Sequence, residues 1–462
     1  MEGNCLRDGS DGDPLDLIGA PFAVIESDPG VFTMLMRKLG VHGLEVMELY
    51  DIEPWAVDHL DPHGLIFCYL CADENGTEDE DVQDDCDAPD PDAQDIWFAN
   101  QLSDDACASQ AMLNIIFNCR GVQLDPSLHR FHMDTEKMSW VMKGLAITNC
   151  QFIREAQNSL ARPADLRAAN HSIATKISKE MKHKNASTAT PASKKRKSTT
   201  KTNRGKKQQK TKEDQQDTFH FIAYVPCDGK VWELDGLRIS GPLEVGEISD
   251  AGGPSGRQGW MDVVRPALKL KMQRHLSGEA REQIRYNLLA IVDDQYMKFS
   301  DALEMQKRER SALERRLDKE YPNSWSDKVN ENLLVNASQV FSTSVHSSDL
   351  GPTYAQDFGS RKMVKDMSIL DMPVRSLPSA WEACVQAAMA AKVSVEDEIT
   401  KSKNMNADFI RRTFDYEPFI QTFVTCLQEE GLLQPILSGQ QPSNNEPSTA
   451  KAKSKPKKRS RR

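Results

Sequence analysis

The chain has 462 residues, 39% of them hydrophobic, and a formal net charge of −11 from 58 Lys and Arg against 69 Asp and Glu. This length allows two or three domains with at least one sizeable core, so a wholly disordered chain is excluded. The N-terminus lacks the basic and apolar regions of a signal peptide, and no apolar run approaches the ~18 residues of a membrane span. We therefore expect a soluble, intracellular protein without a membrane partner.

The ten cysteines are scattered through the chain. In an intracellular protein they are expected to be thiols and not disulfides. Cys68 and Cys71 have a ligand-like spacing, but they lie in an apolar run and no second pair follows. We interpret them as core residues and expect neither a metal nor a cofactor.

Three blocks of like charge interrupt the chain. Residues 73–95 carry twelve acids and no Lys or Arg, residues 176–212 carry fourteen Lys and Arg against one Glu, and residues 451–462 carry eight Lys and Arg. Such blocks cannot form a core, and the simplest interpretation is a solvated loop. The run KKRK at 194–197 and the basic C-terminus also fit nuclear import or a polyanion-binding patch, which we favour.

The first predicted elements are a helix and a strand. Residues 1–20 are expected to be disordered. Asp28-Pro29-Gly30 predicts a helix start with Asp28 as the N-cap, and Gly40 follows as a stop. The apolar run over 64–71 predicts a buried strand.

A second helix is predicted directly after Gln101. It is preceded by three N-cap candidates, which are Ser103, Asp104 and Asp105. Its apolar face contains Ala108, Met112, Ile115 and Cys119. Cys107 then lies in the first turn, where the helix dipole and free N–H groups stabilise a thiolate. This is one way to make a cysteine nucleophilic.

Helices are predicted within 127–161, and the basic stretch at about 170–217 is expected to be a disordered insert. Aromatic and β-branched residues then flank Asp228-Gly229, which predicts a hairpin that pairs residue n with residue 457 − n. His220 lies opposite Leu237 in this register, and Asp235 is its diagonal neighbour on the same face. A core histidine beside a turn aspartate is the competing interpretation.

The remaining chain is predicted to be mostly helical. A buried strand over 284–292 ends the first domain, near residue 295. A charged helix over 296–322, a flexible linker over 323–376, a helical tail domain over 380–440 and a basic disordered tail over 441–462 follow.

Together these residues match the parts of a cysteine hydrolase. Cys107 at a helix N-terminus, His220 on a strand and Asp235 beside it form a triad in outline. The side-chain amide of Gln101 and the Cys107 backbone N–H are candidate donors to an oxyanion.

Five motifs in order resemble the ubiquitin C-terminal hydrolases, a family of papain-like thiol deubiquitinases. They are IESDPGVFTMLMRKLGV near the start, FANQLSDDACASQA, KGLAITN at 143–149, FHFIAYVP and ELDGL. The resemblance covers about residues 21–295. It implies an α/β fold in which a central antiparallel sheet is flanked by helices, with a knotted backbone. It also implies Cys107 as the nucleophile, His220 as the general base and acid, Asp235 as the residue that orients His220, and Gln101 as the oxyanion donor.

Two features depart from the family pattern. Asp105 stands where the family usually has Asn, and an acid there opposes the helix dipole by raising the thiol pKa. The basic insert also lengthens the region where the family has a loop that gates the active site. Asp105 bears on the rate and not on the reaction class. For the insert two alternatives stay open: it leaves the gate long and permissive, or it folds over the site.

Residues 406–437 resemble the helical tail of long-tailed family members, one proteasome-associated and one chromatin-associated. In both, the tail binds a helical adaptor domain of a ubiquitin receptor or scaffold protein. The resemblance implies a ubiquitin-cleaving thiol hydrolase of the nucleus and cytoplasm, with the basic tail contacting nucleosomes or other polyanions. The alternative is a catalytically weak ubiquitin-binding module recruited by its tail. The physiological substrate, the chain linkage and the choice between proteasome and chromatin are not determined by the sequence.

Overall fold

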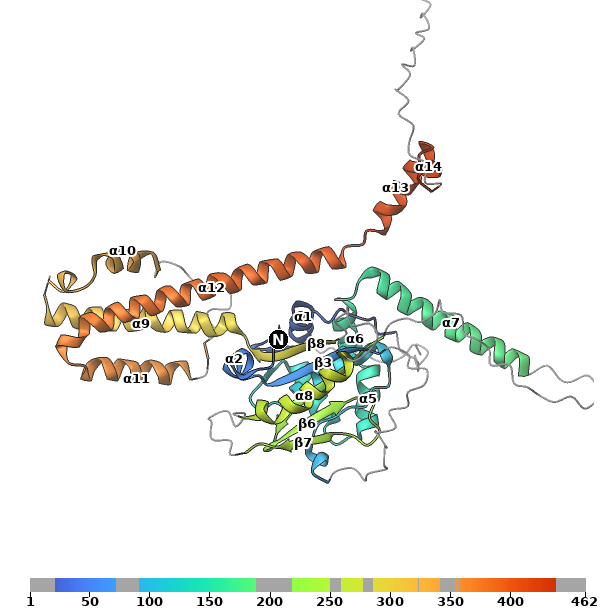
Figure 1. Ribbon diagram of the computed structural model, residues 1–462, viewed down its shortest axis with the longest axis horizontal. Coiled ribbons are helices and arrows are strands. Elements are labelled where there is room, and N and C mark those ends of the chain that lie inside the picture. Colours follow the sequence, from blue (N-terminus) through green and yellow to red (C-terminus); the bar gives the residue numbers. More distant parts are fainter. Residues whose placement is uncertain are drawn as a thin grey trace, which may run out of the picture. The chain divides into compact units, whose positions relative to one another are not determined.

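The computed structural model describes residues 21–71, 91–187, 218–249, 259–276, 286–322, 324–340, 354–355 and 357–437 (Figure 1). It divides into two compact units, Met1–Thr413 and Phe414–Arg462. Among the described helices, none is both long and apolar enough to cross a membrane.

A six-stranded antiparallel sheet lies at the centre of the first unit, with the strand order β2-β8-β3-β5-β6-β7. Its strands are β2 (Leu44–Glu48), β3 (Gly64–Cys71), β5 (Thr218–Cys227), β6 (Lys230–Asp235), β7 (Leu243–Glu247) and β8 (Tyr286–Asp293). A separate ladder pairs β1 (Val41–His42) with β4 (Gln123–Leu124).

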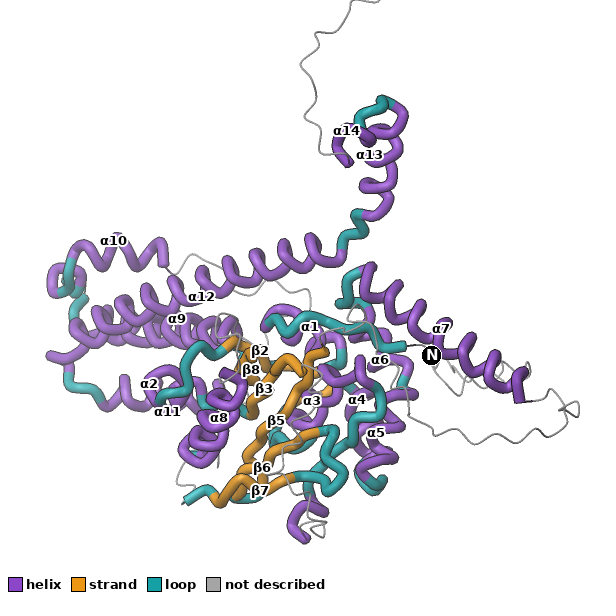
Figure 2. The backbone as a smooth tube through the Cα atoms, turned by 45° about the vertical axis from the view of Figure 1, so that its right-hand side comes forward, coloured by secondary structure: helices purple, strands orange, loops and turns teal. Residues whose placement is uncertain are grey.

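Helices cover both faces of this sheet (Figure 2). One face packs against α1 (Pro29–Lys38), α3 (Cys107–Ile116), α4 (Pro126–Thr135), α5 (Trp140–Asn149) and α6 (Gln151–Asn158). The other face packs against α2 (Pro54–Val57) and α8 (Trp260–Leu276). Alternation along β5 explains the two layers, because Phe221 lies in the first cluster and Ile222 in the second. The predicted α/β class, an antiparallel sheet flanked by helices, is confirmed.

Several local predictions are also confirmed. The Asp28 carboxylate accepts hydrogen bonds from the N–H groups of Gly30 and Val31 and caps α1. The strand predicted over 64–71 is β3. Asp228 and Gly229 have φ values of 50° and 81°, the left-handed pair that a tight hairpin turn needs.

The basic insert begins later than predicted. Helix α7 (Pro163–Ser187) continues well past residue 170, so the first part of the expected disordered segment is helical. Good helix formers such as Ala, Arg and Lys fill this stretch, and a helix needs no apolar face when it extends into solvent.

The predicted flexible linker over 323–376 is wrong in its described part. It contains α10 (Glu331–Val340) and α11 (Phe358–Asp371), which pack with α9 (Gln295–Glu320) and α12 (Leu377–Thr413). The buried residues of this bundle include Leu313, Leu317, Ala337, Ile369 and Trp381. Each short helix has few apolar positions, so its sequence alone does not predict a packed helix. Residues that are distant in the sequence complete the core.

The helical tail expected from residue 380 is divided in the structure. Its first helix, α12, begins at Leu377 and belongs to the first unit. The second unit contains α13 (Glu417–Glu429) and α14 (Leu433–Leu437), neither of which has a buried residue. The predicted disorder of residues 1–20, 188–217 and 441–462, and most of the acidic loop, lies outside the described residues.

Candidate active site

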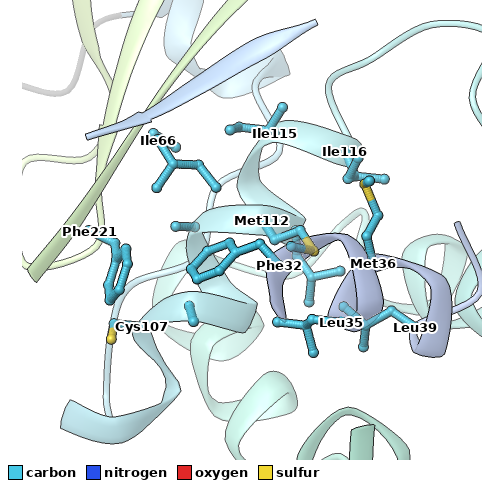
Figure 3. Close-up of a cluster of buried hydrophobic side chains, with 14 of the residues drawn as sticks. Phe32, Leu35, Met36, Leu39, Ile66, Cys107, Met112, Ile115, Ile116 and Phe221 are labelled. Carbon is cyan, nitrogen blue, oxygen red and sulfur yellow. The ribbon is translucent and has the colours of Figure 1, made fainter. Parts of the chain in front are cut away.

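Cys107 is the first residue of α3 and lies at the edge of the larger core cluster (Figure 3). Its exposed fraction is 8%. The cluster also contains Phe221 of β5 and Cys68 of β3. The predicted position in the first turn of a buried helix is therefore confirmed.

Burial dominates the chemistry of this thiol in the free protein. It raises the pKa of Cys107 to about 12, and the nearby Cys68 and Asp105 act in the same direction. The N–H groups of Ala108 and Cys107 oppose the rise by hydrogen bonding to the sulfur. The expected effect of Asp105 is thus confirmed in direction, although burial is the larger cause.

The expected helix caps are wrong. The residue before α3 is Ala106, and neither it nor Ser103 makes a side-chain cap hydrogen bond. A short 3₁₀ turn, Asp104–Ala106, follows Ser103 and contains the other two candidates, so the N-cap position of α3 falls on Ala106.

The structure brings His220 and Asp235 together. The hairpin has the predicted register, with Ile222 opposite Asp235, and His220 Nε2 lies 2.8 Å from Asp235 Oδ1. The Asp235 carboxylate also accepts a bond from Leu237 N at 2.9 Å. Burial acts to raise the pKa of Asp235, but the hydrogen bond and charge of His220 outweigh it and hold the pKa below its usual value.

The Gln101 backbone is fixed against the turn that follows Asp235. Gln101 N donates to the Gly236 carbonyl at 2.7 Å, and the Asn100 side chain donates to the Arg238 carbonyl at 2.9 Å. A Cβ on Gly236 would lie 2.9 Å from the Gln101 Cβ, so only glycine permits this approach. The contact between Gln101 and Gly236 therefore fixes the position of Gln101 relative to Asp235.

Three amide side chains that the sequence analysis missed hold the segment before Gln101. Asn114 of α3 and Asn118, just after the helix, bond the backbone of Ala99 and Trp97, and Gln110 Nε2 donates to the Ala99 carbonyl. Their i, i+4, i+8 spacing along this mostly apolar helix and the turn that follows it was a usable sequence signal. They place Gln101 and Cys107 on one rigid support.

Cys107 and His220 are not joined by a hydrogen bond among the described residues. His220 alternates with Phe221, which belongs to the Cys107 cluster, and its ring contacts Tyr69 edge-on at 5.5 Å between centroids. The free protein therefore presents a formed His–Asp pair and a thiol whose pKa is raised by burial. Catalytic hydrogen bonds often tighten only in the substrate complex.

Comparison with known proteins identifies the family. The model for ubiquitin carboxyl-terminal hydrolase, family 1, matches residues 22–273, and the model UCH_C, described as ubiquitin carboxyl-terminal hydrolases, matches 388–433. The chain belongs to ubiquitin carboxyl-terminal hydrolase family 1. It is a cysteine-type deubiquitinase, as the sequence motifs predict.

Relatives of two kinds match this hydrolase. The ubiquitin carboxyl-terminal hydrolase isozyme L5 of Dictyostelium discoideum is 27% identical over 90% of the chain and 94% of the relative. BAP1 of Gallus gallus is 30% identical over 63% of the chain, which spans only 35% of BAP1. A crystal structure of Trichinella spiralis UCH37 bound to ubiquitin vinyl methyl ester is 28% identical and covers 61% of this chain and 87% of that one, with a TM-score of 0.40.

Proposed function

We propose that Cys107, His220, Asp235 and Gln101 carry out the hydrolysis of the bond that follows the ubiquitin C-terminal glycine. The observation that supports this most strongly is the hydrogen bond between His220 and Asp235. The turn that follows Asp235 also holds Gln101, because the Gly236 carbonyl accepts a hydrogen bond from Gln101 N. Cys107 lies at the start of the helix whose amide side chains hold the Gln101 segment. The orienting acid and the oxyanion donor thus flank one turn, and the nucleophile starts the helix that supports that donor.

The proposed reaction follows from these positions. The Cys107 sulfur attacks the carbonyl carbon of the C-terminal glycine while its proton passes to His220. The oxyanion accepts hydrogen bonds from the Gln101 side-chain amide and the Cys107 N–H. As the carbon–nitrogen bond breaks, His220 returns the proton to the leaving amine, and a thioester remains on Cys107. His220 then activates a water, which releases the ubiquitin carboxylate and restores the thiol.

Asp235 orients the imidazole through this cycle. Its carboxylate accepts a hydrogen bond from His220 and a second from Leu237, so it stays ionised and fixed. A fixed anion stabilises the imidazolium that forms when His220 takes the thiol proton. Lys271 of α8 bonds the neighbouring Glu233 at 2.7 Å, and its charge lowers the pKa of Asp235 further.

Substrate binding must also bring His220 to the thiol. The thiol is buried, and burial raises its pKa and so disfavours the thiolate in the free enzyme. We propose that ubiquitin binding selects the conformation in which His220 reaches the sulfur.

Cys107→Ala tests the assignment directly. We expect it to abolish hydrolysis of a fluorogenic ubiquitin C-terminal amide and to leave ubiquitin binding largely intact. Covalent capture of the unmodified enzyme by a ubiquitin with a C-terminal electrophile distinguishes an active hydrolase from a weak ubiquitin-binding module. Full activity in Cys107→Ala would exclude this cysteine as the nucleophile.

Gln101→Ala tests the oxyanion role. Removing one oxyanion donor costs roughly 10²–10³ in kcat, and we expect a loss in this range with little change in KM. A loss confined to KM would assign Gln101 to substrate binding instead. The measurement is steady-state kinetics on the same fluorogenic substrate.

The partners and location are proposed from the C-terminal region and the charge blocks. The UCH_C match over 388–433 and the exposed Phe419 and Phe423 support binding of a helical adaptor domain of a proteasomal ubiquitin receptor or chromatin scaffold. The basic residues 451–462 support contact with nucleosomes or other polyanions. We propose that the enzyme acts in the nucleus and the cytoplasm.

A further inference from the structure

The start of α3 lacks a cap of its own. Ala106 occupies the N-cap position and has no side-chain oxygen to offer, yet the first turn of this helix is buried. Buried helix N–H groups that find no partner destabilise a protein, so another part of the fold must satisfy them.

Gln157 of α6 supplies the missing partner. Its Oε1 accepts bonds from Ser109 N at 3.3 Å and Ser109 Oγ at 2.6 Å. Its Nε2 donates to the Asp105 carbonyl at 2.6 Å and to the Ala23 carbonyl at 2.8 Å. The side chain is fully buried, with an exposed fraction of 0%, and both its acceptor and its donor capacity are used.

The position of these contacts is specific. Cys107, Ala108 and Ser109 are the first three residues of α3, and a normal N-cap side chain bonds the N–H of the second or third. Gln157 takes the third N–H from outside the helix. The N–H groups of Cys107 and Ala108 have no side-chain acceptor among the described residues, and both act to lower the pKa of the Cys107 thiol.

A cap from outside the helix also explains why Ala106 suits this site. A Ser or Asp at position 106 would place an oxygen among the N–H groups that the thiolate and the oxyanion need. Gln157 holds the peptide before Cys107 through the Asp105 carbonyl and leaves those N–H groups available.

We propose that Gln157 is a positioning residue of the hydrolase, which caps α3 from outside so that the Cys107 and Ala108 N–H groups face the reacting atoms. This inference rests on the proposed role of Cys107. Gln157 itself is buried and touches no substrate, so it acts only through the turn that it holds.

The chain offers a matched control in the next residue. Asn158 also bonds the N-terminal segment, by accepting from Ala23 N at 2.8 Å and donating to the Pro21 carbonyl at 2.9 Å. These bonds reach neither Asp105 nor Ser109. Asn158→Leu therefore removes a comparable anchor of α6 and leaves the Cys107 turn intact.

The experiment compares Gln157→Met, Gln157→His, Ser109→Ala and Asn158→Leu in the full chain, using steady-state kinetics on a fluorogenic ubiquitin C-terminal amide and thermal unfolding. Gln157→Met is expected to lower kcat about 10–100-fold with KM nearly unchanged, because a small misplacement of reacting groups has this effect. Gln157→His is expected to recover most of that kcat, since a neutral imidazole can both accept and donate. Ser109→Ala, which removes one of the four contacts, is expected to lower kcat by a smaller factor.

Asn158→Leu is expected to change stability but not kcat. If Gln157→Met lowers kcat no more than Asn158→Leu does, or if its effect is on KM alone, the positioning role is wrong. Should Gln157→Met not fold, Ser109→Ala provides the comparison, and a kcat no lower than that of Asn158→Leu then overturns the positioning role. Cys107→Ala is measured in parallel to separate the two proposals. If Cys107→Ala still hydrolyses the substrate, the catalytic assignment of Cys107 is wrong. If Cys107→Ala is inactive but Gln157→Met has a normal kcat, only the role proposed for Gln157 is wrong.

Discussion

Asp105 shows how one side chain sets a limit on the reactivity of its neighbour. It lies two residues before Cys107, and its charge raises the pKa of the thiol together with burial and Cys68. The opposing N–H groups come from the start of α3. The state of the nucleophile in the free protein is therefore a balance in which desolvation is the largest influence.

Asp105→Asn is expected to lower the pKa of Cys107. A thiolate is negative, so removing a nearby negative charge favours it, and the rate of alkylation below the pKa increases. The measurement is the alkylation of the Cys107 peptide as a function of pH, followed by mass spectrometry. Asp105→Glu retains the charge and serves as the control. An unchanged profile in Asp105→Asn would mean that the carboxylate acts too weakly to matter.

At the scale of elements, α9 to α12 form a bundle with a core separate from the sheet. The cluster around Trp381 and Leu313 shares no residue with the clusters on the two sheet faces. The C-terminal half of α12 nevertheless forms ion pairs with α1 and with a strand of the sheet. Arg412 bonds Asp28, the N-cap of α1, at 2.8 Å, and Lys401 bonds Glu45 of β2 at 3.1 Å.

Trp381→Ala is expected to destabilise this bundle and to spare the cleavage of a small ubiquitin substrate. Trp381 is fully buried and its Nε1 donates to Glu314 at 3.1 Å, and removing such a side chain typically costs about 3–5 kcal/mol. Hydrogen exchange of the amides in 295–413 measures the loss of stability. Val393→Ala serves as the control, because the Val393 side chain is 56% exposed. Loss of cleavage in step with the bundle would show that bundle and sheet unfold as one unit.

At the scale of the whole molecule, the described parts of the two units differ in the burial of their apolar side chains. The first unit has buried cores, whereas the helices of the second unit have no buried residue. In the second unit Phe419 and Phe423 are 66% and 53% exposed, and their rings stack 6.1 Å apart. Helices α13 and α14 therefore present apolar side chains that need a partner surface.

Replacing Phe419 and Phe423 with Ser is expected to abolish binding to the proposed adaptor and activation on large substrates, while small-substrate cleavage persists. Truncation after Leu437 removes the basic residues and is expected to weaken nucleosome binding, most evidently at low salt. It is expected to leave adaptor binding and the cleavage of a small substrate unchanged. Pull-down and activity assays on both variants, at low and high salt, check the two effects. If the truncation also abolished small-substrate cleavage, the basic residues would be part of the catalytic fold.

The sequence by itself determined the features that depend on neighbours within one element. The Asp28 cap, the Asp228-Gly229 turn and the register that joins His220 to Asp235 are local, because turn chemistry and strand alternation specify them over a few residues. The family motifs also predicted the activity.

Only the tertiary structure decided the rest. The packing of α10 and α11 depends on apolar residues of α9 and α12, which no local pattern could supply. The cap of α3 comes from Gln157, 52 residues after Asp105, whereas local preference predicted Ser103, Asp104 or Asp105. In each case the deciding energy is a contact between distant segments, and such contacts form only when the whole chain is packed.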